Sequence, residues 1–207
     1  MLVTQESRRS RSYRRPRAEV NGNSRAAYNP LPDGEHVMKV LLSQDAIQAR
    51  VVEMGRQIAA DYVGMDPHLV GVLKGACTFM TDLCRAIDLP LTLDYIAVSS
   101  YGAATKSSGE VQLVKDLDRG LDGRDLIVVE DIVDTGLTLN YLLKVLRARG
   151  PRSLKVATLL SKPSRRLVET PLDYVGFTIE DHFVVGYGLD YNEKYRNLRD
   201  ILVYGTS

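Results

Sequence analysis

The sequence has few of the features that mark secreted or membrane proteins. Only two of its 207 residues are cysteines, Cys77 and Cys84. Seven residues apart in a predicted helix, they are separated by roughly 10 Å, which is too far for a disulfide, so we expect two reduced thiols. No apolar run approaches the ~18 residues of a membrane span, and the N-terminus lacks the apolar segment of a secretory signal. These absences predict a soluble cytoplasmic protein that does not bind a membrane.

Net charge is also nearly absent, but the charges are unevenly distributed. Residues 1–30 hold seven arginines against two glutamates, about +5, whereas the rest of the chain carries about −4. A mildly acidic folded part argues against nucleic-acid binding through a broad basic face. Residues 1–36 are rich in Arg, Ser, Asn and Pro and lack periodicity, which predicts a disordered basic tail before a domain at 37–207. The tail could also contact RNA or act as a transit peptide, but its composition favours a dispensable extension.

Apolar runs alternate with helical patterns along the rest of the chain. Short runs rich in Val and Ile predict buried strands, and an apolar spacing of three or four residues predicts helices. We expect helices at about 44–62, 76–89 and 138–150, the first capped by Ser43 and the third by Thr138. We expect strands at 37–42, 69–73, 91–98, 111–114, 126–129, 153–160, 173–179, 183–187 and 201–204. This alternation predicts an α/β fold with a mainly parallel sheet flanked by helices on both faces.

Polar residues directly follow four of the predicted strands. They are Lys74-Gly75, Ser100-Tyr101, Glu130-Asp131 and Lys162. In open parallel sheets, ligands bind beyond the carboxyl ends of the strands. We therefore expect these residues to meet at one edge of the sheet, although they lie far apart in the sequence.

The segment Leu126–Leu139 (LIVVEDIVDTGLTL) combines a strand, a turn and a helix start. Asp134-Thr135-Gly136 is a turn composition, because Gly tolerates backbone angles that other residues resist. A strand, a Gly-containing turn and a helix N-terminus together make an anion site. The adjacent acids Glu130 and Asp131 would repel a phosphate unless they bind something else, such as sugar hydroxyls or magnesium.

Residues 130–136 (EDIVDTG) resemble the signature of the phosphoribosyltransferases, and four further motifs follow the order of the purine-salvage branch. These are LKGA at 73–76, SSYG at 99–102, LLSK at 159–162 and DHFVVGYGLDYNEKYRNL at 181–198. The resemblance covers roughly residues 38–204 and is to bacterial-type hypoxanthine-guanine phosphoribosyltransferases. It implies a type I phosphoribosyltransferase fold with a small hood subdomain and a mobile loop.

The resemblance also implies an enzyme of purine salvage. Such an enzyme transfers the phosphoribosyl group of phosphoribosyl pyrophosphate to N9 of hypoxanthine or guanine, giving IMP or GMP, with Mg²⁺ as cofactor. A homodimer or homotetramer is expected. The alternatives are a xanthine-preferring phosphoribosyltransferase and an RNA-binding regulator of the same fold, which the acidic balance of the folded part argues against.

By resemblance, the segment Leu126–Leu139 would hold the sugar phosphate. Glu130 and Asp131 would bind the ribose 2′- and 3′-hydroxyls, and Asp134 would be the catalytic acid/base at purine N7. A carboxylate in this turn could instead be only a turn-former. The 5′-phosphate would be bound by Asp134, Thr135, Gly136, Leu137 and Thr138. Leu137, where some relatives carry Lys, is typical of the bacterial branch.

The purine site would consist of Lys162, Phe183, Val184 and Asp190. Lys162 would donate a hydrogen bond to the 6-oxo group, which selects against adenine, and Phe183 would stack on the base. An ordinary exposed lysine and a core aromatic are the alternative interpretations of these two residues.

The remaining predicted residues would bind pyrophosphate and metal. Pyrophosphate would contact Lys74, Gly75 and Arg196, and the metal would be held by Asp190, Glu130 and Asp131. In relatives a peptide bond of the Lys74-Gly75 type can be cis. Ser100 and Tyr101 would belong to the mobile loop that closes over the reacting centre.

Overall fold

The computed structural model describes residues 36–100 and 111–206. The predicted tail therefore lies almost wholly outside the described residues, as does Tyr101 of the predicted mobile loop. The elements are β1 (His36–Leu42), α1 (Gln44–Asp61), β2 (His68–Leu73), α2 (Cys77–Ala86), β3 (Thr92–Ser100), β4 (Val111–Lys115), β5 (Asp125–Val133), α3 (Leu137–Arg147), β6 (Ser153–Ser161), the 3₁₀ helix η1 (Pro163–Arg165), β7 (Tyr174–Thr178), β8 (Val184–Val185) and β9 (Ile201–Thr206).

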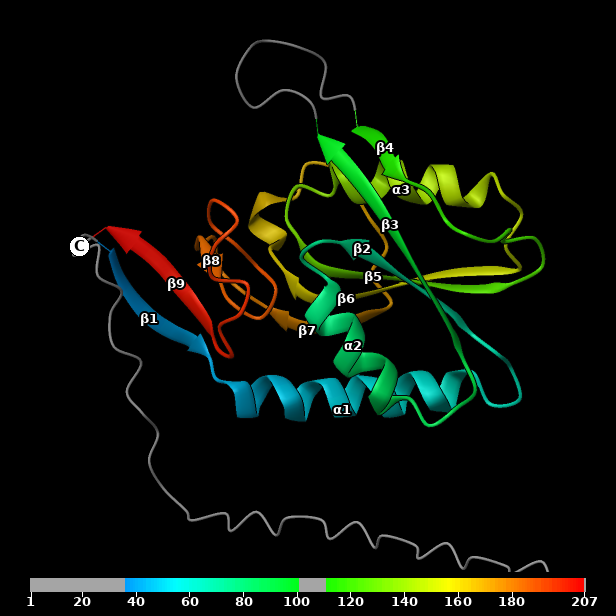
Figure 1. The fold of residues 1–207 in the computed structure, drawn as a ribbon, viewed down its shortest axis with the longest axis horizontal. Coiled ribbons are helices and arrows are strands. Elements are labelled where there is room, and N and C mark those ends of the chain that lie inside the picture. Colours follow the sequence, from blue (N-terminus) through cyan, green and yellow to red (C-terminus); the bar gives the residue numbers. More distant parts are fainter. Residues whose placement is uncertain (1–35, 101–110, 207) are drawn as a thin grey trace, which may run out of the picture. The chain divides into compact units, whose positions relative to one another are not determined.

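The larger sheet has six strands in the order β4-β3-β2-β5-β6-β7 (Figure 1). All neighbouring pairs are parallel except β3 and β4, which run antiparallel. The central strands β2 and β5 are almost wholly buried, as the unbroken apolar runs predict for strands covered on both faces. The predicted mainly parallel α/β sheet is therefore confirmed.

Helices cover both faces of this sheet, with α1 and α2 on one face and α3 on the other (Figure 1). Ile58 of α1 and Leu83 of α2 share a buried cluster with Ile127 of β5. The next residue of the strand, Val128, points the other way and packs in a second cluster with Leu142 of α3. None of the helices in residues 36–100 and 111–206 is long and apolar enough to cross a membrane.

The smaller sheet, β1-β9-β8, joins the two ends of the described chain into the hood subdomain. Polar contacts fasten the hood to the helices of the larger layer. The Tyr187 hydroxyl after β8 donates to Asp82 of α2 at 2.6 Å, and the Gln44 backbone N–H of α1 donates to Asp200 at 2.6 Å. The hood is therefore held next to the carboxyl ends of the central strands.

Helix starts were predicted with mixed success. Ser43 does cap α1, since its hydroxyl accepts the Ala46 N–H at 3.3 Å. Thr138 does not cap α3, because the N-cap is Gly136 and the helix begins at Leu137. The left-handed backbone of Gly136, with φ of 82°, ends the turn sooner than the Thr138 cap requires.

One expectation about the length of a strand was also wrong, whereas the two cysteines are as expected. The strand predicted at 183–187 is only two residues long, Val184–Val185. The buried face of α3 consists of Leu139, Leu142, Leu143 and Leu146. Both cysteines are free thiols.

A glycine at the contact between α1 and α2 allows a specific test. A methyl group added at Gly55 would lie 2.5 Å from the Ala86 carbonyl oxygen, which belongs to the backbone and cannot move away easily. Helix propensity alone predicts that Gly55→Ala gains about 1 kcal/mol, whereas overpacking costs about 1–3 kcal/mol. We expect a net loss in the free energy of unfolding, measured by urea denaturation. The reverse exchange at the exposed Ala60 of the same helix, Ala60→Gly, should lower the free energy of unfolding by only about 1 kcal/mol, the difference in helix propensity. A stabilised Gly55→Ala variant would contradict the close packing.

Candidate functional site

Two adjacent carboxylates lie near the end of β5. The sequence predicts a strand that ends at Val129, but β5 continues through Glu130 and Asp131 to Val133. Glu130 is 7% exposed, and burial together with the neighbouring charge of Asp131 raises the pKa of its carboxyl well above the usual range. Burial also raises the pKa of Asp131 to about 6, although the Ile132 N–H donates to its carboxylate at 2.8 Å. Neither carboxylate forms an ion pair within the described residues, so the pair can accept a cation or hydroxyl donors.

Two glycines bring distant segments into direct contact with this pair. A Cβ on Gly75 would overlap the Asp131 carboxylate, and a Cβ on Gly188 would overlap the Gly75 carbonyl oxygen. The β2–α2 loop and the hood therefore approach the end of β5 without any side chain between them. Glycine is required at both positions, and at Gly188 the backbone is also left-handed, with φ of 104°.

The loop after β8 brings charged groups to the same place. Asp190 pairs with Arg196 at 2.7 Å and accepts the Glu193 N–H at 2.9 Å. Glu193 pairs in turn with Lys74 at 2.7 Å. The charge of Arg196 offsets part of the rise in the pKa of Asp131 that burial causes, so this loop lies within electrostatic reach of the carboxylate pair. The structure thus brings together the predicted residues Lys74, Asp131, Asp190 and Arg196.

The backbone of this loop is unusual. Four residues other than glycine have left-handed angles: Tyr187, Asn192, Glu193 and Tyr195. Such angles are costly for residues with a Cβ and concentrate at functional sites. Neither composition nor periodicity indicates this strain.

The turn after β5 encloses a cavity of about 210 Å³. Its walls include Glu130, Asp134, Thr135, Gly136 and Thr138. The N–H groups of the first turn of α3 have no intrahelical acceptor and lie at the positive end of the helix dipole. Gly136 has a left-handed φ, and a Cβ there would lie 2.6 Å from the Thr170 hydroxyl. The turn and the helix start are therefore suited to an anion, and the anion site stays a prediction.

Asp134 and Lys162 both have partners that the sequence did not predict. Arg165 of η1 donates to the Asp134 carboxylate at 3.2 Å and lies 3.5 Å from Asp181. Asp181 also lies 3.6 Å from the Lys162 ammonium group, which is buried. The interpretation of Lys162 as an ordinary exposed lysine is therefore wrong.

A second arginine, Arg166, forms hydrogen bonds with the backbone of the turn. Its guanidinium donates to the carbonyl oxygens of Asp134 at 3.1 Å and Val133 at 3.3 Å, and to the Ser161 hydroxyl at 3.1 Å. These bonds join the end of β6 to the turn after β5. The run Arg165-Arg166, which begins three residues after the predicted Lys162, was the available sequence signal, but periodicity does not reveal such contacts.

Phe183 is not a core residue, since it is 51% exposed. Its ring contacts Tyr191 and Tyr204 edge-on, with centroid distances of 5.8 and 5.9 Å, which leaves ring surface open. Val184 follows it as the first residue of β8 and is buried. Of the predicted mobile loop, only Ser100 falls within the described residues, at the end of β3.

The cis peptide bond in this region joins Leu73 and Lys74. The expectation of a cis bond therefore applies one residue earlier than Lys74-Gly75.

Comparison with known proteins identifies this arrangement. A family model described as a phosphoribosyl transferase domain matches residues 39–192. The chain belongs to the phosphoribosyltransferase family, and its fold is that of the type I enzymes. The resemblance inferred from the motifs is thereby confirmed.

Particular relatives carry more specific names. Hypoxanthine-guanine phosphoribosyltransferase of Mycobacterium avium is 54% identical over 168 residues, covering 78% of this chain and 83% of that protein. The bifunctional protein TilS/HprT of Listeria monocytogenes is 52% identical over 162 residues, 78% of this chain, but the chain spans only 25% of that protein's length. A crystal structure of a hypoxanthine phosphoribosyltransferase from Staphylococcus aureus has a TM-score of 0.78 and 46% identity, covering 81% of this chain and 91% of that one.

The carboxylate pair predicts a specific dependence of stability on pH. The pKa values of Glu130 and Asp131 are higher in the folded protein than in the unfolded chain, so their ionisation opposes folding. This penalty is absent below about pH 4, grows as the pH rises from there to the folded-state pKa values, and is constant above them. Because Asp131 keeps some exposure, we expect Asp131→Asn to raise the free energy of unfolding by about 1–2 kcal/mol at pH 7.5 and little at pH 4.

Urea denaturation at both pH values, with EDTA present, measures this difference. Asp88→Asn removes an exposed acid outside the pair and should give no gain that grows with pH. A variant no more stable than the parent at pH 7.5 would show that the pair does not oppose folding.

Proposed function

We propose that the chain transfers the phosphoribosyl group of phosphoribosyl pyrophosphate to N9 of hypoxanthine or guanine, releasing pyrophosphate and forming IMP or GMP. One observation carries the proposal: Glu130 and Asp131 stand unneutralised between the anion site after β5 and the charged loop after β8. The names of the relatives from Mycobacterium and Staphylococcus support the choice of purine.

In this proposal the segment after β5 holds the sugar phosphate. The 5′-phosphate enters the cavity lined by Asp134, Thr135, Gly136 and Thr138 and accepts hydrogen bonds from backbone N–H groups there, those of Leu137 included. Glu130 and Asp131 accept hydrogen bonds from the vicinal ribose hydroxyls. Negative charge beside the ribose also stabilises a transition state that resembles an oxocarbenium ion at C1.

The purine lies beyond the end of β6. Lys162 donates to the 6-oxo group, Phe183 stacks on the base, and the backbone near Val184 faces the 2-position, with Asp190 at the edge of the purine site. Asp134 exchanges a proton with N7 as the new bond forms at N9. Exposure of the Phe183 ring and the position of Asp134 in the turn support these roles.

Pyrophosphate leaves between Lys74-Gly75 and Arg196. Residues 36–100 and 111–206 contain no cluster of three side chains that could hold a metal, so the protein alone does not supply a full ligand set. Mg²⁺ typically takes one or two carboxylates together with substrate phosphate oxygens, and the unpaired Glu130 and Asp131 would fit that partial role. Asp190, the third ligand predicted from the sequence, is paired with Arg196 in this structure and would have to leave that pair to reach the metal. Bound Mg²⁺ would supply charge neutralisation of the leaving group.

One further proposal concerns assembly. The chain forms a homodimer or homotetramer, which sedimentation of the purified protein measures directly.

A comparison of bases tests the function. Purified protein with Mg²⁺ and phosphoribosyl pyrophosphate should convert hypoxanthine and guanine to nucleotides, with adenine at least about 100-fold slower in kcat/KM because its amino group opposes the Lys162 donor. Steady-state rates with hypoxanthine, guanine, xanthine and adenine decide the matter. Absence of nucleotide from both hypoxanthine and guanine would refute the proposal, and faster turnover of xanthine would replace it with a xanthine-preferring enzyme.

The role of Asp134 has its own test. Asp134→Asn preserves the shape of the turn but cannot exchange a proton with N7, so we expect kcat to fall by about 10²–10⁴ with little change in the KM for phosphoribosyl pyrophosphate. Thr138→Ser, which keeps a hydroxyl in the same cavity, serves as the matched control and should retain most of kcat. An equal loss of kcat and of binding in Asp134→Asn would indicate a turn-forming role instead.

A further inference from the structure

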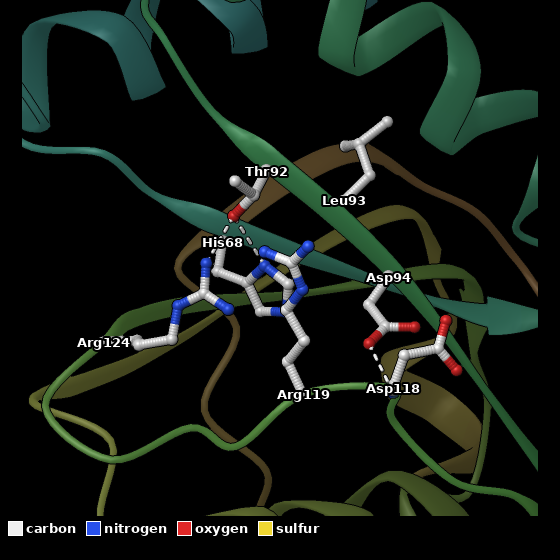
Figure 2. A pocket seen from close by; sticks show the side chains of 7 residues that line it. All are labelled: His68, Thr92, Leu93, Asp94, Asp118, Arg119 and Arg124. Atoms are coloured by element: carbon white, nitrogen blue, oxygen red, sulfur yellow. Dashed lines mark hydrogen bonds between the residues drawn. The ribbon is translucent and has the colours of Figure 1, made fainter.

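A second cavity lies at the opposite end of the sheet from the candidate site. Its volume is about 290 Å³, and it is lined by the first residues of β2 and β3, His68 and Thr92, and by Arg119 and Arg124 of the connection between β4 and β5 (Figure 2). Strand β2 ends at Leu73, next to Lys74 of the candidate site. His68 is therefore roughly 17 Å along the strand from that site, so one ligand cannot occupy both positions.

The positive and negative groups of this cavity differ in how well they are neutralised. Both oxygens of the Asp94 carboxylate accept backbone N–H groups, from Tyr95 and Asp118, and Lys115 lies 3.5 Å away. Asp118 is itself paired with Lys115 at 3.2 Å. The acids of the cavity are thus already satisfied.

The two arginines of the cavity, in contrast, are not neutralised. Within the described residues, neither Arg119 nor Arg124 forms an ion pair, and the side-chain hydrogen bond of Arg124 goes to the neutral Thr92 hydroxyl at 2.6 Å. Figure 2 shows both arginines reaching from the same connection toward His68, with Asp94 and Asp118 beside each other away from them. Arg119 is exposed, so its guanidinium can turn around a ligand without breaking a contact.

His68 adds a buried polar atom that lacks a partner. The side chain is 1% exposed, and its Nδ1 lies 2.8 Å from the Thr92 hydroxyl, while Nε2 has no hydrogen-bond partner. An orphaned buried polar atom is rare and calls for an explanation. If Nδ1 accepts the Thr92 hydroxyl hydrogen, Nε2 carries the N–H and is an unused donor beside two unpaired guanidinium groups.

We propose that this cavity, which we call the far cavity, binds a phosphate group through Arg119, Arg124 and His68 Nε2. Two guanidinium forks and one imidazole N–H supply more donors than the two oxygens of a carboxylate can accept, and a phosphate offers more acceptor oxygens. The volume is at the lower end of the range for small-molecule sites, which fits inorganic phosphate or a small phosphate monoester.

Nitrogen NMR of histidine side chains tests the proposal directly. The chain has three histidines, His36, His68 and His182, so ¹⁵N-histidine labelling of the full chain gives a simple spectrum. Titration with inorganic phosphate, and separately with glycerol phosphate, at constant ionic strength should shift the His68 Nε2 signal in a saturable way. The comparison of the two ligands shows whether the site prefers free phosphate or a monoester.

Variants separate the far cavity from the candidate site. Arg119→Gln should weaken the binding reported by His68 at least about tenfold, because one charge-assisted contact is lost. Arg56→Gln removes an exposed arginine of α1 and should leave the phosphate binding reported by His68 unchanged. His182 lies next to Asp181 of the candidate site, so its signal reports phosphate bound there and should respond equally in both variants. No saturable shift of His68, or the same affinity in Arg119→Gln, would overturn the proposal.

Discussion

The adjacent carboxylates of Glu130 and Asp131 impose the constraint on which the rest of the site depends. Two like charges at the end of a buried strand oppose folding, and the raised pKa values of both groups express that cost. The compensation among the described residues is partial: it consists of the backbone N–H groups of Ile132 and of Asp131 itself and of the charge of the nearby Arg196. The carboxylates therefore keep a negative potential at the cavity, and this potential lowers the stability of the fold. Hydroxyl donors or a developing cation would relieve it.

The same carboxylates explain why glycine stands at two distant positions. Gly75 lets the β2–α2 loop contact Asp131 through backbone atoms, and Gly188 in turn lets the hood contact the Gly75 carbonyl oxygen. A larger residue at either position would push Lys74 or the Asp190–Arg196 pair away from the carboxylates. The hood and the sheet therefore both contribute residues to the candidate site, although these residues lie far apart in the sequence.

The sequence predicts the framework of this site better than its contacts. Four apolar residues before Glu130 place that residue at the end of a central strand, and a parallel sheet brings Lys74, Asp131 and Lys162 to the same edge. The pairing of Arg165 with Asp134 could not be predicted, because it depends on how far a long side chain reaches between two loops without periodicity. The Thr138 cap failed for a related reason, since composition does not show that Gly136 already ends the turn.

The unpredicted pairs change how base selection is understood. In the structure Lys162 faces Asp181 and Asp134 faces Arg165, so a purine that binds as proposed has to replace both partners. Under the proposed function, a 6-oxo group replaces the Asp181 carboxylate as an acceptor, whereas the amino group of adenine would leave a buried ammonium group facing another donor. The penalty for that unsatisfied charge, about 1–3 kcal/mol or more, then contributes to selectivity alongside the new contact itself. Hypoxanthine, guanine and xanthine share the 6-oxo group and differ at C2, so Lys162 cannot distinguish among them. Under the proposed function, that choice falls to the backbone near Val184, where β8 is the edge strand of the smaller sheet and pairs only with β9 among the described strands.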